Sequence, residues 1–332
     1  MADPAIAAHG LVKHFGPVAA LEGIDLAVQA GNVLGVLGPN GAGKTTAVRI
    51  LATILKPDAG QASVLGLDVV RDAEQVRAVI GLAGQYAALD ENLTGRENLR
   101  LIGRLTHQPR GAIAARAEEL LDRFGLQTAA RRPVRTYSGG MRRRLDLAVA
   151  LVHRPLVLFL DEPTTGLDPV GRAELWTLIG QLVTGGTTVL LTTQYLEEAD
   201  RLANTIVVID RGQIIADGTP AQLKASLGAT IVEIRVADQG GAQRAAAGLQ
   251  RIGPADMLDG GRVLALRVTD KGPAIQEVLR LLDACAVVPD SVAIREPTLD
   301  DVFLQLTGHR AGPGPDEPAL PSAVLSRAGS LT

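Results

Sequence analysis

Short apolar runs bounded by glycine and proline alternate with segments of helical periodicity through about residue 227. Four of these runs are continuous enough to predict buried strands, at residues 33–37, 156–160, 187–192 and 206–209. Helical segments lie between them, most clearly at residues 44–55 and 171–183. This alternation predicts an α/β fold with a mainly parallel sheet.

The pattern changes between about residues 85 and 151, which are mostly helical, with the clearest pieces at 97–105, 112–124 and 139–152. We interpret this stretch as a helical subdomain inserted between two parts of one sheet. After residue 227 a smaller α+β pattern begins, with strands at 230–236, 262–268 and 287–295 and helices at 242–252, 274–284 and 299–306. We therefore expect a first domain over 1–228, a small C-terminal domain over 229–309, and a disordered Pro-, Gly- and Ser-rich tail over 310–332.

Composition narrows the class of protein. Hydrophobic residues make up 46% and charged residues 21%, as in ordinary globular domains. The net charge of −3 and the 2% of aromatic residues argue against a nucleic-acid partner. Cys285 is the only cysteine, which excludes an intrachain disulfide and a cysteine metal site. We see no secretory signal and no apolar run of about 18 residues, so we do not expect the chain itself to span a membrane.

A glycine-rich segment between the first predicted strand and helix matches the P-loop pattern GxxxxGK(S/T) in full. Its glycines let backbone N–H groups turn toward phosphates, and the helix that follows directs its positive end at them. Lys44 is expected to reach the β- and γ-phosphates of ATP, and Thr45 to bind Mg²⁺. A glycine-rich turn with a chance lysine is the alternative. The residues of the predicted phosphate site are Gly38, Pro39, Asn40, Gly41, Ala42, Gly43, Lys44, Thr45 and Thr46.

Two acids follow the predicted strand at 156–160. Asp161 is expected to hold Mg²⁺ through a water, as a Walker-B aspartate does. Glu162 is placed to orient and deprotonate a water that attacks the γ-phosphate. Acids at a strand end can also be solvated loop residues, an interpretation that the upstream P-loop disfavours.

A Ser-Gly-Gly sequence at Ser138, Gly139 and Gly140 precedes a long amphipathic helix. Its place between the P-loop and the acidic strand resembles the LSGGQ signature of ABC ATPases, and the resemblance covers roughly residues 5–225. The serine and the two amides lie at a predicted helix N-terminus, a position suited to a γ-phosphate. The resemblance implies that this phosphate belongs to a second copy, so that a homodimer encloses two ATP molecules. A plain helix cap is the alternative.

The resemblance assigns four further positions. Phe15 would stack on adenine, although it could also pack on the sheet. Gln85 would be the Q-loop glutamine that senses Mg²⁺ and water and abuts the membrane partner, and Asp168 would close the D-loop at the dimer interface. Gln194 stands where most ABC ATPases have a histidine; its amide can donate to a phosphate oxygen but cannot carry a proton. Glu162 is therefore expected to be the main base.

Three longer stretches narrow the resemblance. They are YSGGMRRRLD from Tyr137, LLTTQYLEEAD from Leu190 and TLDDVFLQLTG from Thr298. Together they resemble the DrrA type of daunorubicin-resistance ABC ATPase. The resemblance implies an ATP-hydrolysing subunit that drives drug efflux through a separate integral-membrane permease, at the cytoplasmic face of the membrane. The arginines at 142–144 are interpreted as a solvated helix face, or simply as part of this pattern.

Other functions stay open. A lipid or polysaccharide exporter is the nearest alternative, because an ATPase subunit need not touch the cargo. A soluble ABC ATPase that acts on DNA or ribosomes is less consistent with the chain, which has one cassette and no sustained heptads between P-loop and signature. A non-catalytic nucleotide-binding regulator is disfavoured, because the chain keeps the residues expected to carry out hydrolysis, Lys44, Asp161 and Glu162.

Overall fold

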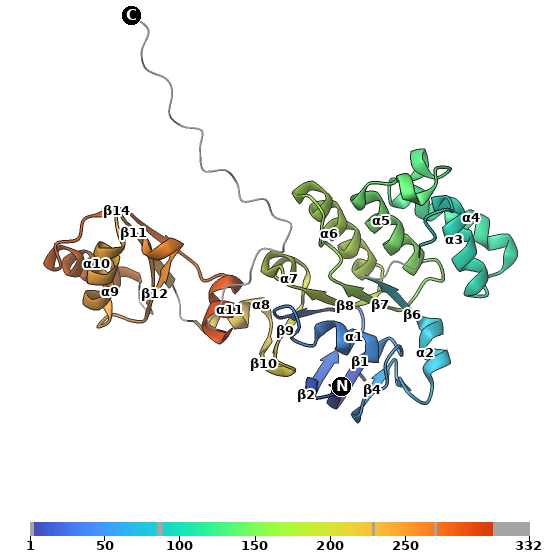
Figure 1. The fold of residues 1–332 in the computed structure, drawn as a ribbon, viewed down its shortest axis with the longest axis horizontal. Coiled ribbons are helices and arrows are strands. Elements are labelled where there is room, and N and C mark those ends of the chain that lie inside the picture. The colour runs from blue at the N-terminus through green and yellow to red at the C-terminus, as the bar shows by residue number, and fades with distance from the viewer. Residues whose placement is uncertain (1–2, 85–88, 228–229, 269–270, 308–332) are drawn as a thin grey trace, which may run out of the picture.

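The computed structural model describes residues 3–84, 89–227, 230–268 and 271–307 (Figure 1). The predictions made for Gln85 and for the 310–332 tail therefore concern residues outside the described ranges. Among the described residues, no helix has the length and apolar character that crossing a membrane requires.

A six-stranded sheet lies at the centre of the larger part of the molecule, in the order β10-β9-β3-β8-β7-β6 (Figure 1). Every neighbouring pair is parallel except β10 and β9, which confirms the prediction of an α/β fold with a mainly parallel sheet. The strands are β3 (Val33–Leu37), β6 (Ile80–Ala83), β7 (Val157–Asp161), β8 (Thr188–Thr193), β9 (Thr205–Asp210) and β10 (Gln213–Gly218).

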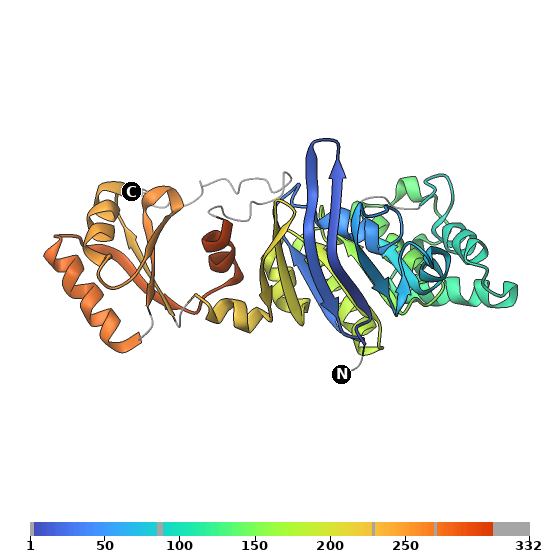
Figure 2. The ribbon, with the colours of Figure 1, turned by 90° about the horizontal axis from the view of Figure 1, so that it is seen from below.

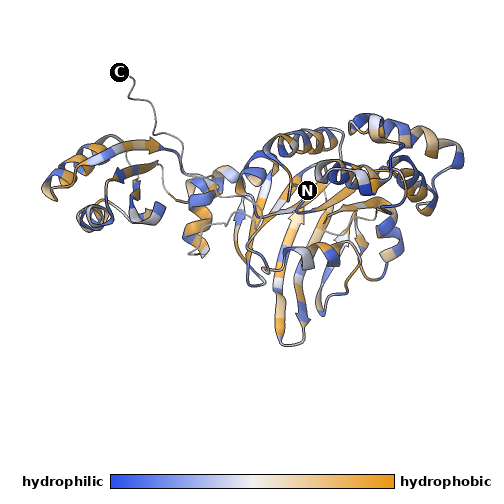
Figure 3. Ribbon diagram, turned by 45° about the horizontal axis from the view of Figure 1, so that its top comes forward, coloured by the Kyte–Doolittle hydropathy of each residue, from blue (hydrophilic) through white to orange (hydrophobic). Residues whose placement is uncertain are grey.

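Both faces of this sheet are covered. Val157 and Phe159 of β7 pack with α1 (Lys44–Leu51) on one face, and Leu158 and Leu160 pack with α5 (Gly139–Ala150) and α6 (Pro169–Thr184) on the other. Figure 3 shows the hydrophobic residues concentrated along these strands, three of which are buried at every position. Burial on both faces explains why the sequence shows continuous apolar runs here.

An antiparallel sheet in the order β2-β1-β4-β5 covers the outer side of α1, and the sequence analysis did not predict it. Strands β1 and β2 form the long hairpin that Figure 2 shows. Register shifts interrupt the pairing of β1 with both neighbours, so the alternation that identifies a half-buried strand is broken. The strands are β1 (Ile6–Phe15), β2 (Val18–Val28), β4 (Ala59–Val64) and β5 (Leu67–Asp68).

The predicted helix at 44–55 is too long, because α1 ends at Leu51 and Thr53 then turns the chain with a φ of 64°. Between residues 89 and 151 the described chain is mostly helical, and its three main helices begin within two residues of their predicted starts. Thr94 and Glu97 form a capping box at the first of these helices. The helical elements are α3 (Gly95–Leu105), α4 (Arg110–Arg123), short 3₁₀ turns at Gln127–Ala129 and Val134–Thr136, and α5. Short helices α2 (Ala73–Val79), α7 (Leu196–Leu202) and α8 (Pro220–Ala225) lie elsewhere around the sheets.

The C-terminal part has its own antiparallel sheet, in the order β12-β13-β11-β14, and α9 and α10 contribute to its core. The last helix, α11, leaves this unit and packs against α7 and α8 of the larger part, as Figure 1 shows. The elements are β11 (Thr230–Val236), α9 (Gln239–Leu249), β12 (Ala255–Leu258), a 3₁₀ turn at Asp259–Gly261, β13 (Val263–Val268), α10 (Lys271–Ala284), β14 (Pro289–Arg295) and α11 (Leu299–Thr307).

Candidate functional site

The predicted P-loop forms the turn between β3 and α1. Gly43 has a φ of 112°, and a Cβ added there would lie 2.4 Å from the carbonyl oxygen of Ala20. A Cβ on Gly38 would lie 2.1 Å from the carbonyl oxygen of Ile209. Only glycine fits these two positions, because the neighbouring backbone comes so close. The exposed part of the loop consists of Pro39, Asn40 and Gly41. The next two residues, Ala42 and Gly43, are buried, and Thr45 and Thr46 are half-buried.

Lys44 lies in the hollow of this loop and is 4% exposed. Its Nζ donates hydrogen bonds to the carbonyl oxygens of Gly38, at 2.8 Å, and Pro39, at 3.1 Å. The same atom is 3.4 Å from Oε1 of Glu162. Burial lowers the pKa of Lys44, and the charge of Glu162 opposes this shift. The loop therefore holds a cation where α1 begins.

A cluster of oxygen atoms lies at the carboxyl end of β7. The Oδ1 atom of Asp161 accepts hydrogen bonds from the hydroxyls of Thr45, at 3.1 Å, and Thr192, at 2.6 Å. Carboxylate and hydroxyl oxygens are ligands that Mg²⁺ prefers. Within the described ranges no group of three or more His, Cys, Asp or Glu side chains could hold a metal ion. The donor chemistry of Thr45 and Asp161 therefore fits a magnesium ion bound together with a nucleotide.

Glu162 follows β7 in a backbone conformation unusual for this residue type, with a φ of 51°. Its N–H donates to the carbonyl oxygen and to the hydroxyl of Thr192, both at 3.1 Å. The residue is 7% exposed, and its carboxylate faces the Lys44 ammonium. Such strain persists only where surrounding contacts enforce it, and it concentrates at functional sites.

The predicted signature residues lie apart from the P-loop within one chain. Ser138 caps α5 by accepting a hydrogen bond from the Met141 N–H at 3.3 Å, and Ser138 and Gly139 are exposed. Since α5 and α1 pack on opposite faces of the sheet, the structure does not bring Ser138 together with Lys44. Gly140 lies half-buried in the first turn of α5.

The other predicted residues that the structure describes lie at the ends of strands or helices. Phe15 is 48% exposed at the end of β1, and Lys13 Nζ lies 5.8 Å from the centre of its ring. Asp168 is exposed and caps α6 by accepting from the Gly171 N–H at 2.8 Å. Gln194 is half-buried directly after β8. Gln85 lies outside the described residues.

Two charged residues behind the site are functional candidates that the sequence analysis missed. Arg143 is largely buried against the end of β7, so the interpretation of the 142–144 arginines as a solvated face is wrong for this residue. Its spacing from buried Leu147 and Ala150 on α5 is a signal that could have revealed this.

Glu198 on α7 is fully buried and accepts hydrogen bonds from Thr164 Oγ1, at 3.2 Å, and Trp176 Nε1, at 3.1 Å. Burial raises its pKa to about 7, although these hydrogen bonds, one from Thr193 and the charge of Arg143 oppose the shift. Its neighbours Leu196 and Ala199 are buried on the same helix, so the apolar face of α7 includes one acid.

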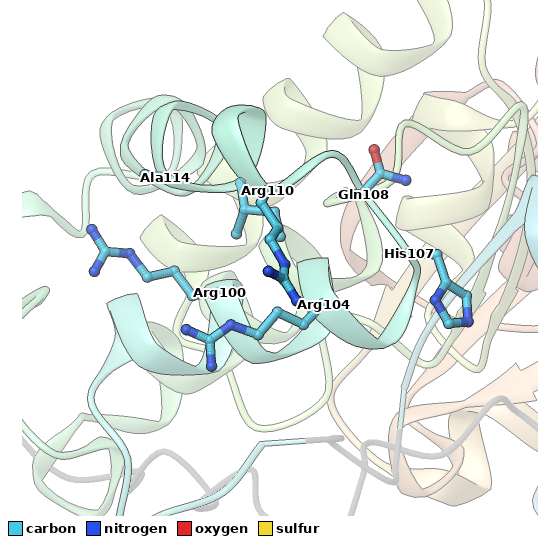
Figure 4. A pocket seen from close by; sticks show the side chains of 7 residues that line it. Arg100, Arg104, His107, Gln108, Arg110 and Ala114 are labelled. Atoms are coloured by element: carbon cyan, nitrogen blue, oxygen red, sulfur yellow. The ribbon is translucent and has the colours of Figure 1, made fainter.

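A separate cavity of about 840 Å³ lies at α3 and α4 and shares no residue with the predicted nucleotide site (Figure 4). It is lined by Arg100, Arg104, His107, Gln108, Arg110, Ile113 and Ala114.

Comparison with known proteins shows to which family the chain belongs. The ABC transporter family matches residues 21–165, and the C-terminal domain of ATP-binding proteins of the DrrA1-3-like type matches residues 218–307. The chain is 55% identical to the daunorubicin resistance ATP-binding protein DrrA3 of Streptomyces coeruleorubidus, over 93% of this chain and 97% of that protein. It is 48% identical to the daunorubicin/doxorubicin resistance ATP-binding protein DrrA of Streptomyces peucetius, over 92% of this chain and 93% of that protein.

The fold is also that of a solved ATP-binding cassette. A dimeric cassette in a post-hydrolysis state, bound to ADP and Pi, superposes with a TM-score of 0.60 at 24% identity, over 64% of this chain and 98% of that one. ABC cassettes hydrolyse ATP, and the P-loop, the signature helix and the acidic strand end follow one another here in the order of that family. The chain therefore belongs to the ABC transporter ATPases, and within them to the DrrA-type ATP-binding proteins.

Proposed function

We propose that this protein is the ATP-hydrolysing subunit of an exporter that expels a hydrophobic drug, of the daunorubicin kind, through a separate membrane permease. The observation that carries the proposal is the constellation of Lys44, Thr45, Asp161 and Glu162 at one end of the sheet. The names of the relatives support the class of cargo, because both are resistance proteins for daunorubicin.

Each side chain has a proposed part in hydrolysis. Lys44 binds the β- and γ-phosphates, and the P-loop amides at the start of α1 surround them. Glu162 accepts the proton of the attacking water, and the Gln194 amide donates to a γ-phosphate oxygen. Thr45 and Asp161, with Gln85, hold Mg²⁺, which when bound neutralises part of the phosphate charge. Phe15 offers an exposed ring on which adenine stacks.

The active form is proposed to be a homodimer. Ser138, Gly139 and Gly140 lie at the N-terminus of α5, on the other face of the sheet from α1. A second copy facing the first supplies these groups to the nucleotide held by Lys44, and Asp168 follows at the interface. The dimeric state of the ADP-bound cassette supports this arrangement.

The permease partner places the protein at the cytoplasmic face of the membrane. We propose that the helical subdomain at about 85–151 and Gln85 transmit closure of the dimer to the permease. The unit over 229–309 strengthens the dimer or regulates it, and the domain over 1–228 carries the ATPase. The chain is not expected to bind nucleic acid.

An affinity purification tests the partner. Tagged Glu162→Gln protein is expressed in its source cell, and solubilised membranes are captured with Mg-ATP. We expect one polytopic membrane protein in stoichiometric amount. Ribosomes, DNA, or a bait that stays away from membranes would instead favour a soluble ABC ATPase.

The cargo needs a second experiment. The captured complex, rebuilt with wild-type ATPase in vesicles, is supplied with daunorubicin, with a labelled lipid or with a labelled oligosaccharide. ATP-dependent transport of the drug supports the proposal, while transport of the lipid or oligosaccharide alone would replace it with the alternative exporter.

A further inference from the structure

Arg143 joins the signature helix to the end of the acidic strand. From α5, its guanidinium donates to the carbonyl oxygens of Pro163, at 2.6 Å, and Asp161, at 3.3 Å, and also to that of Glu162. The three consecutive carbonyls belong to the turn that gives Glu162 its positive φ. A planar guanidinium with five donors suits such a set of divergent acceptors.

The same side chain also reaches the strand next to β7. Its Nη1 donates to the carbonyl oxygen of Gly84 at 2.7 Å, and Asp146 Oδ2 accepts from the N–H of Gly84 at 3.1 Å. Arg143 and Asp146 lie one turn apart on α5, with Nη1 and Oδ2 3.8 Å apart. Together they hold both backbone polar groups of the residue that directly precedes Gln85.

Gly84 in turn lies against the acidic strand. A Cβ added to it would be 2.8 Å from the Cβ of Asp161. The end of β6, the end of β7 and the second turn of α5 therefore meet around the guanidinium of Arg143, whose side chain is 16% exposed.

The neighbouring arginines have different partners. Arg142 pairs with Glu91 at 2.9 Å and Arg144 with Glu174 at 3.5 Å, and neither pair includes a residue of the turn at 161–163. The contacts of Arg143 thus do not follow from a general basic face of the helix.

We propose that Arg143, paired with Asp146, is a positioning residue that fixes the Glu162 turn relative to the signature helix, so that hydrolysis depends on it more than ATP binding does. This proposal rests on the proposed role of Glu162 as the base. A displacement of about 1 Å at a reacting group can lower turnover by roughly 100-fold. The hydrogen bonds of Lys44 go to the P-loop carbonyls of Gly38 and Pro39, so the proposed phosphate site is expected to keep its geometry when Arg143 is replaced.

The test measures kcat, KM and direct ATP binding for purified full-length variants. Arg143→Gln is expected to lower kcat by about 10- to 100-fold and to change KM and ATP affinity by less than about threefold. Arg143→Lys is expected to recover little of kcat, since an ammonium cannot reach all four carbonyls. Arg144→Gln is the matched control on the same helix and should retain wild-type kcat.

Arg143→Gln could unfold the protein, because it leaves the buried Asp146 carboxylate without its cation. The double variant Arg143→Gln/Asp146→Asn removes both charges and should recover the unfolding midpoint while kcat stays low. Recovery of kcat together with the midpoint would overturn the positioning role, and so would equal losses of kcat and ATP affinity. Glu162→Gln in the same assay separates the two proposals: if it hydrolyses ATP normally, the base assignment fails, whatever Arg143 does.

Discussion

The Nζ atom of Lys44 lies 3.4 Å from Oε1 of Glu162, so the cation of the P-loop and the proposed general base form an ion pair with little access to solvent. A γ-phosphate that enters the P-loop offers the lysine a second and more highly charged partner. Transfer of the ammonium toward the phosphate would release Glu162 to accept a proton from water. With Glu162 as the base, the pair would link substrate binding to the availability of that carboxylate.

Glu162→Gln is expected to lower steady-state ATP hydrolysis by at least about 100-fold, because an amide has the shape of the carboxylate but cannot accept the proton. ATP binding should survive or become tighter, since a negative charge next to the phosphates is lost. Phosphate release and equilibrium nucleotide binding measure the two effects. Comparable hydrolysis by the variant would exclude Glu162 as the base.

Phe15→Ala is expected to weaken ATP binding by about five- to tenfold, in line with the loss of roughly 1 kcal/mol of stacking. Phe15→Tyr should bind ATP as the wild type does, because stacking needs only a ring. Val18→Ala is the control, since Val18 is 61% exposed on the same hairpin and no role is proposed for it. If Phe15→Ala and Val18→Ala bind ATP equally well, Phe15 does not contact the adenine ring.

The elements that carry the chemistry were the most accessible to prediction from sequence. Strand β3, the P-loop and α1 are contiguous, and the buried strand before Asp161 has no polar interruption. The sheet at the N-terminus was missed because bulges break its alternation. The contacts of Arg143 were missed for a different reason. Helical spacing can indicate that the side chain is buried, but its partners are backbone carbonyls at two strand ends distant in sequence, and carbonyls leave no trace in residue type.

Glu198 should make the stability of the protein depend on pH. An isolated glutamate titrates near 4.5, whereas burial raises the pKa of Glu198 in the folded chain to about 7. Between these values the folded state keeps a proton that the unfolded state has lost. The free energy of unfolding therefore falls as pH rises through this window, by about 1.4 kcal/mol per pH unit.

Glu198→Gln should remove this contribution, because the amide is neutral at every pH and its oxygen can still accept from Trp176 Nε1. Thermal unfolding midpoints between pH 4.5 and 7.5 measure the difference between variant and wild type. Glu197→Gln, which changes the exposed neighbour, is the control. Equal pH dependence in wild type and Glu198→Gln would contradict the raised pKa.

Phe303 of α11 is 4% exposed and packs in one cluster with Leu196 of α7 and with Leu223 and Leu227 at α8. This helix therefore packs the C-terminal end of the described chain against the ATPase part. Phe303→Ala should therefore lower the free energy of unfolding by about 3–5 kcal/mol if the cavity does not collapse. If detachment of α11 from α7 and α8 costs less than this, the helix should detach instead. We expect a lower unfolding midpoint and faster proteolysis near residue 299.

Leu306→Ala provides the control, because Leu306 lies on the same helix but is 41% exposed.

The same variants test the proposed contribution of the C-terminal unit to dimerisation. In a Glu162→Gln background, ATP-dependent sedimentation as a dimer should weaken with Phe303→Ala and with deletion of 230–309, but not with Leu306→Ala. Proteolysis shows whether α11 is detached in Phe303→Ala. If the dimer then forms as well as in the parent protein, packing of α11 and dimerisation are independent, and the C-terminal unit does not act on the dimer through this helix.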